Sequence, residues 1–173
     1  MGITASQVSE LRAQTGVGLM ECKKALVDSN GDIEAALKAL REKGLAKAQK
    51  KAERSTNEGK VFVAESADNS EAVIIELNCE TDFVANNEAF AELGNKIAQL
   101  SLENKLTDVD AVNGADINGQ SVKDHISEYV LKLGENISVS KVSAFYNTSA
   151  VSSYIHMNGK IGVLVSFSAN LDK

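Results

Sequence analysis

The chain has 173 residues, of which 43% are hydrophobic and 24% charged, with no proline and a formal net charge of -6. This balance predicts a globular protein of two compact units and excludes disordered and fibrous classes. So acidic a chain lacks the basic surface that phosphate backbones require, so we expect no direct nucleic-acid partner. Cys22 and Cys79 are too few for a disulfide framework. With no leader or membrane-length apolar run, we expect a cytoplasmic protein without membrane contacts.

Residues 1–54 are predicted to form a three-helix N-terminal domain with a basic linker helix. Thr4 and Gln7 have the spacing of a capping box, Gly16 is a typical helix end, and Asp32 is a good N-cap for the third helix. Apolar residues at helical spacing indicate the faces that pack together. They are Val8 and Leu11 in the first helix, Leu19, Cys22 and Leu26 in the second, and Ile33, Ala36, Leu37 and Leu40 in the third.

The linker is predicted from a change of composition at the end of the third helix. Gly44 is expected to end that helix, and residues 43–54 then combine alanines with basic side chains, which favours helix but provides little to a core. Two interpretations stay open for the charges. They form either a solvated helix face, as most charge runs do, or a docking site for an acidic partner.

From residue 55 the pattern predicts an α+β core of antiparallel β-hairpins packed with helices. Residues 55–140 are expected to form a first subdomain. Its elements are a hairpin over 61–77, a polar junction over 81–86, a helix with an apolar stripe over 90–100, a loop, a helix over 122–133 and a strand over 137–145.

Residues 141–173 are expected to begin a second subdomain that repeats the first. Tyr154-Ile155-His156, a turn at Asn158-Gly159 and the strand over 161–165 mirror the hairpin over 61–77. The second half therefore looks incomplete, because no helix like that over 90–100 follows to cover it. An uncovered apolar hairpin is a pairing surface, so self-association of the chain is expected.

The sequence offers few candidates for catalysis or for a cofactor. Gly16-Val17-Gly18 is only part of a dinucleotide motif and no phosphate-binding loop is present. His125 and His156 have no second ligand at helical spacing, so we expect surface or satisfied core histidines rather than a metal site. Cys79 stands beside carboxylates that raise a thiol pKa, which favours a buried structural cysteine over a nucleophile.

Five segments together resemble the elongation factor Ts family. They are NCETDFVAN at 78–86, TGVGLMECKKAL at 15–26, NGDIEAA at 30–36, LGENI at 133–137 and IGVLV at 161–165. The resemblance covers essentially the whole chain. Departures are Val17 and Leu19, where alanine and methionine are common, and a turn after His156 that is one residue longer than usual.

The resemblance implies a ubiquitin-associated-like N-terminal module, an α+β core of two related halves, and a non-enzymatic guanine nucleotide exchange factor without cofactors. Its implied partner is elongation factor Tu, the GTPase of translation elongation. It also implies a set of partner contacts. Asp82 and Phe83 form a wedge near the nucleotide and Mg²⁺, Leu11, Leu19 and Met20 dock the N-terminal module, Lys23 and Lys51 add polar contacts, and Leu133, Gly134 and His156 are core contacts.

Other interpretations remain open from the residues alone. Phe83 lies seven residues before Phe90 and fourteen before Ile97, so it could extend their buried stripe. Leu19 could likewise pack inside the bundle, whereas Met20 lies off its apolar face. The alternative function is a ubiquitin-associated-like binding module fused to an unrelated α+β domain. A third class is a cysteine enzyme that uses Cys79.

Overall fold

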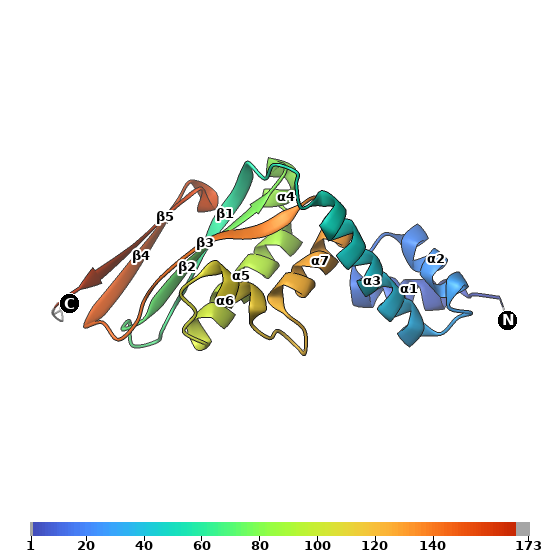
Figure 1. Cartoon of the computed structure of the whole chain (residues 1–173), viewed down its shortest axis with the longest axis horizontal. Coiled ribbons are helices and arrows are strands. Elements are labelled where there is room, and N and C mark those ends of the chain that lie inside the picture. Colours follow the sequence, from blue (N-terminus) through green and yellow to red (C-terminus); the bar gives the residue numbers. More distant parts are fainter. Residues whose placement is uncertain (1, 169–173) are drawn as a thin grey trace.

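The computed structural model describes residues 2–168 and confirms the α+β class. The molecule is elongated, with the N-terminal helices at one end, the last β-hairpin at the other and a sheet covered by helices between them (Figure 1). The helices and strands therefore form three groups along the long axis: the N-terminal bundle, the covered sheet and the second hairpin.

The N-terminal bundle consists of α1 (Ala5–Thr15), α2 (Leu19–Asp28) and the first part of α3 (Ile33–Lys51). The capping box of Thr4 and Gln7 is present, and Gly16 ends α1 in the left-handed conformation at φ 65°. Asp32 caps α3 by accepting a hydrogen bond from the Ala35 amide at 3.0 Å. These predicted helix boundaries are confirmed. The buried residues of the bundle are Val8, Leu11, Val17, Cys22, Ala25, Leu26, Ala36 and Leu40, joined by Leu131 from the core.

The prediction that Gly44 ends the third helix is wrong. α3 continues through Gly44 for 19 residues, so the basic segment over 43–54 is not a separate linker helix but mostly its second half. Gly44 is buried, and a Cβ added there would lie 2.9 Å from the Ser127 carbonyl oxygen. The glycine is therefore explained by the close approach of another helix backbone rather than by a helix end.

A three-stranded antiparallel sheet forms the centre of the core. Its strands are β1 (Glu58–Glu65), β2 (Ala72–Cys79) and β3 (Ile137–Phe145), in the order β1-β2-β3. The register shifts between Glu76 and Leu77, which pair with Lys141 and Val139, so Ser140 is the extra residue of a bulge. The boundary expected at residue 140 falls inside β3. The first sheet therefore extends to Phe145.

Helices cover one face of this sheet. α5 (Glu88–Glu103) packs on β1 and β2 through a stripe that includes Phe90, Leu93 and Ile97, all fully buried. α7 (Val122–Leu133) packs on β3 and against α3 of the N-terminal bundle. The loop predicted between them contains a short helix, α6 (Val109–Gly114). Within the described residues, none of the helices is long and apolar enough to cross a membrane.

The second hairpin stacks on the opposite face of the sheet. It consists of β4 (Ala150–His156), the short helical turn η1 (Met157–Gly159) and β5 (Ile161–Phe167). A Cβ added at Gly162 would lie 2.5 Å from Ile74 Cδ1 and 2.7 Å from Val61 Cγ2, so this face of the hairpin contacts the sheet directly.

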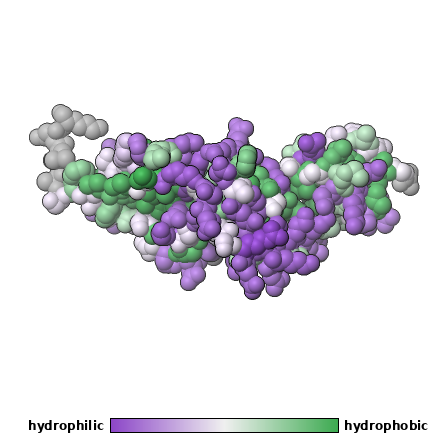
Figure 2. All heavy atoms as spheres, turned by 90° about the horizontal axis from the view of Figure 1, so that it is seen from above, coloured by the Kyte–Doolittle hydropathy of each residue, from purple (hydrophilic) through white to green (hydrophobic). Residues whose placement is uncertain are grey.

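The outer face of the hairpin is apolar and exposed. Tyr154 pairs with Val163, and His156 with Ile161, so these side chains share the face that points away from the sheet. Hydrophobic residues gather at this end of the molecule (Figure 2). The first sheet covers the inner face of the hairpin, whereas no helix of the described residues covers its outer face, as predicted. The exposed apolar side chains of the outer face are Tyr154, Ile161, Val163 and Val165.

Candidate functional site

Phe83 is the most exposed large hydrophobic residue of the described chain, at 85% of its surface. It lies in α4 (Asp82–Ala85), a single helical turn that is separated from the end of β2 by Glu80 and Thr81. Thr81 caps this turn, because its hydroxyl accepts a hydrogen bond from the Val84 amide at 3.4 Å. Val84 and Ala85 are buried. The turn is thus fixed on its inner side and presents Phe83 outward.

The interpretation of Phe83 as part of the α5 stripe is wrong. Phe90 and Ile97 are fully buried, but α4 ends at Ala85 and Asn87 starts a new helix by accepting from the Ala89 amide at 2.9 Å. The seven-residue spacing therefore does not lie on one continuous helix. This break rotates Phe83 away from the core.

Glu135 braces the junction from the loop that leads into the neighbouring strand β3. Its carboxylate accepts hydrogen bonds from the Glu80 amide at 3.1 Å, the Thr81 amide at 2.9 Å and the Thr81 hydroxyl at 2.6 Å. Hydrogen bonds to a charged acceptor are among the stronger ones in proteins. The backbone immediately before Asp82 is consequently held by the loop between α7 and β3.

Glu80 supports the same loop in return. Its carboxylate accepts from the Asn136 amide at 2.7 Å, and this hydrogen bond, with the nearby Arg54 charge, holds the pKa of Glu80 below its usual value. The Asn136 side chain donates to the Ala52 and Arg54 carbonyl oxygens at 3.4 and 3.0 Å. Two loops and the end of α3 are thereby joined into one unit.

Three other predicted contacts lie in this unit. The Lys51 ammonium donates to the Gly134 carbonyl oxygen at 2.6 Å. Gly134 is exposed and ends α7, and Leu133 is half-buried against the core. The structure thus groups Asp82 and Phe83 with Leu133, Gly134 and Lys51, although Lys51 is engaged within the chain.

His156 lies on the second hairpin, at the end nearest α4. It is exposed, its ring stacks on Tyr154 at 5.8 Å, and its Nδ1 lies 3.0 Å from the Tyr154 hydroxyl. Two residues further on, the Asn158 side-chain amide donates to the Asn86 side-chain oxygen at 3.3 Å. His156 therefore belongs to the same edge of the molecule as α4.

The remaining predicted contacts lie on the N-terminal bundle. Met20 is 72% and Leu19 48% exposed at the start of α2, and Lys23 is exposed one turn further. Leu11 is fully buried between the helices of the bundle. The expectation that Leu11 docks a partner directly is therefore corrected, because its side chain has no free surface.

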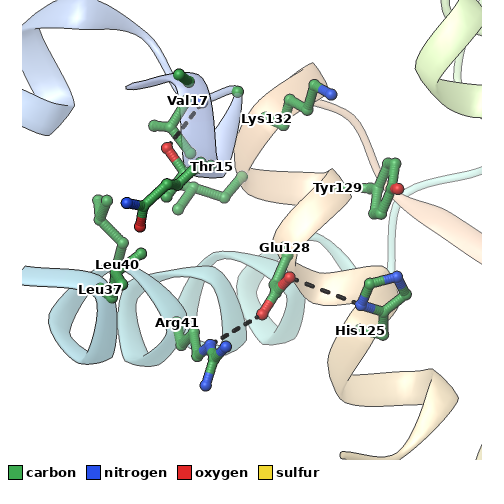
Figure 3. A pocket seen from close by; sticks show the side chains of 13 residues that line it. Thr15, Val17, Leu37, Leu40, Arg41, His125, Glu128, Tyr129 and Lys132 are labelled. Atoms are coloured by element: carbon green, nitrogen blue, oxygen red, sulfur yellow. Dashed lines mark hydrogen bonds and ion pairs between the residues drawn. The ribbon is translucent and has the colours of Figure 1, made fainter. Parts of the chain in front are cut away.

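A pocket of about 280 Å³ lies between the bundle and the core. α1, α3 and α7 line it, and the Glu128 carboxylate forms an ion pair with Arg41 at 3.2 Å and lies 3.6 Å from Nδ1 of His125 (Figure 3). None of its lining residues is a predicted partner contact. The pocket instead marks where α3 and α7 join the two halves of the molecule.

Two of the titratable groups singled out from the sequence, Cys79 and His125, are buried. Burial, together with the Glu135 charge, raises the pKa of the Cys79 thiol to about 11, so little thiolate exists near neutral pH. His125 is buried, but only one of its two ring nitrogens has a hydrogen-bond partner among the described residues. The Gln120 side-chain amide lies 2.9 Å from Nδ1, whereas Nε2 has no partner there. Burial also lowers the pKa of His125.

Two groups of functional candidates are not evident from sequence patterns. Glu80 and Glu135 hold the junction, yet carboxylates of this kind are usually solvated surface residues. Their only sequence indication is membership of the two motifs at 78–86 and 133–137. Met157, which is 62% exposed in the turn η1, has no indication in the sequence because hairpin stacking alone places it near α4.

The fold and the junction together define a class of protein. An exposed aromatic on a braced turn, and exposed apolar side chains on a helical module at a distance from it, are typical of a surface that binds another protein.

Comparison with known proteins gives the family. The family model described as "Elongation factor TS" matches residues 80–173. Curated relatives named "Elongation factor Ts" include those of Campylobacter hominis (43% identical over 175 residues, 100% of this chain and 50% of the relative), Halorhodospira halophila (44% over 165 residues, 95% and 56%) and Idiomarina loihiensis (44% over 168 residues, 97% and 56%).

The chain therefore belongs to the elongation factor Ts family of translation elongation factors. It spans about half the length of the curated relatives it matches. The family model covers residues 80–173 and the relatives match 95% or more of this chain, so the alternative in which its α+β part is unrelated to elongation factor Ts is wrong.

Proposed function

We propose that this chain is a guanine nucleotide exchange factor for elongation factor Tu and that Asp82 and Phe83 form its wedge. The observation that supports this most directly is the 85% exposure of Phe83 on a turn whose inner side is buried. Covering a large, water-exposed apolar side chain with a partner is favourable, because it removes apolar surface from water. Phe83 is thus a candidate anchor rather than a core residue.

Exchange requires displacement of groups rather than covalent chemistry. A GTPase of the phosphate-loop class holds its nucleotide through backbone amides, a lysine and Mg²⁺, and a shift of these groups by about 1 Å removes much of their contribution. A wedge can impose such a shift only if it does not itself yield. Glu135 is a positioning residue in this proposal, because its three hydrogen bonds hold the backbone before Asp82.

The N-terminal module provides a second contact in this proposal. Leu19 and Met20 expose apolar surface at the start of α2, and Lys23 adds a charge beside them. These side chains belong to α2, which lies in the bundle at one end of the molecule, whereas α4, the turn that carries Phe83, lies beside the central sheet (Figure 1). Leu133, Gly134 and His156 surround the wedge as further contacts, and Leu11 supports the module from inside.

The test is release of a fluorescent GDP analogue from elongation factor Tu, measured after addition of excess unlabelled GDP with and without the chain. We expect faster release with the chain. Linkage requires that GDP weaken binding of the chain by the same factor by which the chain weakens GDP binding, so titration of the complex with GDP is an independent check. An unchanged release rate at concentrations that form the complex would refute the proposal.

A further inference from the structure

The turn between β4 and β5 lies beside α4, although the two are far apart in sequence. One contact joins the turn to the residue that follows α4, and two join it to the start of β1. Asn158 donates to Asn86 at 3.3 Å, Lys160 forms an ion pair with Glu58 at the start of β1, and a Cβ added at Gly159 would lie 3.2 Å from the Lys60 side chain. The turn η1 and α4 accordingly lie along one edge of the molecule (Figure 1).

The backbone of this turn has an uncommon conformation. Met157, Asn158 and Gly159 have φ values of 50°, 54° and 88°, so three consecutive residues adopt the left-handed region. Glycine and asparagine tolerate this region, but methionine rarely adopts it because its Cβ crowds the following carbonyl oxygen. Met157 is flanked by the pairing of His156 with Ile161 on one side and by the hydrogen bond of Asn158 to Asn86 on the other, and 62% of its surface is exposed.

We propose that Met157 is a second apolar contact for the GTPase partner, on the same edge as Phe83. The inference rests on the proposed function. Asn86 follows α4 directly and Asn158 follows Met157, so their hydrogen bond brings both exposed side chains within one interface, which typically covers about 800 Å² of each partner. A flexible thioether suits an irregular apolar gap around a rigid aromatic anchor.

The first experiment observes methionine methyl groups by NMR in the complete chain. The sequence has three methionines, so Met20 and Met157 give resolved signals that Met20→Leu and Met157→Leu assign. Elongation factor Tu loaded with GDP is then added. We expect both signals to shift or broaden. A shifted Met20 signal with an unchanged Met157 signal overturns this inference and leaves the proposed function standing, whereas no change in either signal overturns both.

The second experiment measures affinity for the same GDP-loaded partner. Met157→Gly removes the side chain and suits the left-handed backbone, so the fold is retained. We expect about tenfold weaker binding. The matched control is Val165→Ala, an exposed apolar residue near the far end of the same hairpin, which should leave affinity within about twofold. Equal affinities of Met157→Gly and the unaltered chain would overturn the inference.

Discussion

Replacement of Phe83 by alanine tests the wedge most directly. Because Phe83 is 85% exposed, only roughly 30 Å² of its surface is buried in the free chain. At about 25 cal/mol per Å², truncation removes at most about 0.8 kcal/mol of folding free energy. A buried phenylalanine would instead cost about 3 to 5 kcal/mol. The free energy of unfolding should therefore change little.

The effect on exchange should be much larger. Loss of a central aromatic contact typically costs about 2 to 4 kcal/mol of binding, and 2 kcal/mol corresponds to roughly thirtyfold in rate. The assay pairs the denaturant midpoint of the variant with its rate of GDP release from elongation factor Tu at a fixed subsaturating concentration. We expect an unchanged midpoint with release slowed at least about thirtyfold.

Phe90→Ala is the matched control, because Phe90 is fully buried and packs against Phe62 at 6.1 Å between ring centroids. It should lower the unfolding free energy by about 3 to 5 kcal/mol. A Phe83→Ala variant that loses stability as Phe90→Ala does, with activity lost in proportion, would refute the assignment. An unchanged release rate at full stability would refute it equally.

Four further predictions concern other parts of the chain. Gly44→Ala should lower the unfolding free energy by about 1 to 3 kcal/mol, because the added Cβ meets the α7 backbone and this outweighs the higher helix propensity of alanine. A higher denaturant midpoint of the variant would contradict this. Met20→Asp should weaken complex formation at least about tenfold in a titration while the thermal midpoint stays nearly constant, and the reverse pattern would place Met20 in the core. The chain should self-associate through the exposed face of β4 and β5, and Val163→Lys should abolish this in analytical ultracentrifugation; a monomer at high concentration would count against it. In the folded chain, Cys79 should react slowly with iodoacetamide near pH 8 and faster as the pH approaches its pKa of about 11, because the thiolate is the reactive form. Rapid labelling at pH 7, detected by mass spectrometry, would show that the thiol is not buried as described.

Local sequence patterns were sufficient to predict most of the helices and strands. The capping box at Thr4, the N-cap at Asp32 and the left-handed Gly134 are decided by a few neighbouring residues, so the sequence alone predicts these helix ends. Alternation and turn residues similarly predict both hairpins. The motif at 78–86 indicates the candidate wedge, and its position between a strand and a helix follows from the same patterns.

Contacts between distant segments decided the role of Gly44 and which apolar side chains of the N-terminal bundle are buried. Gly44 has the local character of a helix end, but the approach of α7 explains it as a packing position within α3. Leu11 and Leu19 both occupy predicted apolar positions, yet one is fully buried and the other 48% exposed, because only the assembled bundle determines which positions are covered.

The edge around Phe83 is likewise a product of tertiary structure. The sequence determines that a strand ends and a helix begins near Phe83, whereas the packing of Val84 and Ala85 in the core determines that the Phe83 ring is exposed. Glu135 and Met157 come to this edge only through strand pairing and hairpin stacking. Periodicity describes one element at a time, so it cannot report which elements meet; that depends on side-chain packing across the whole fold.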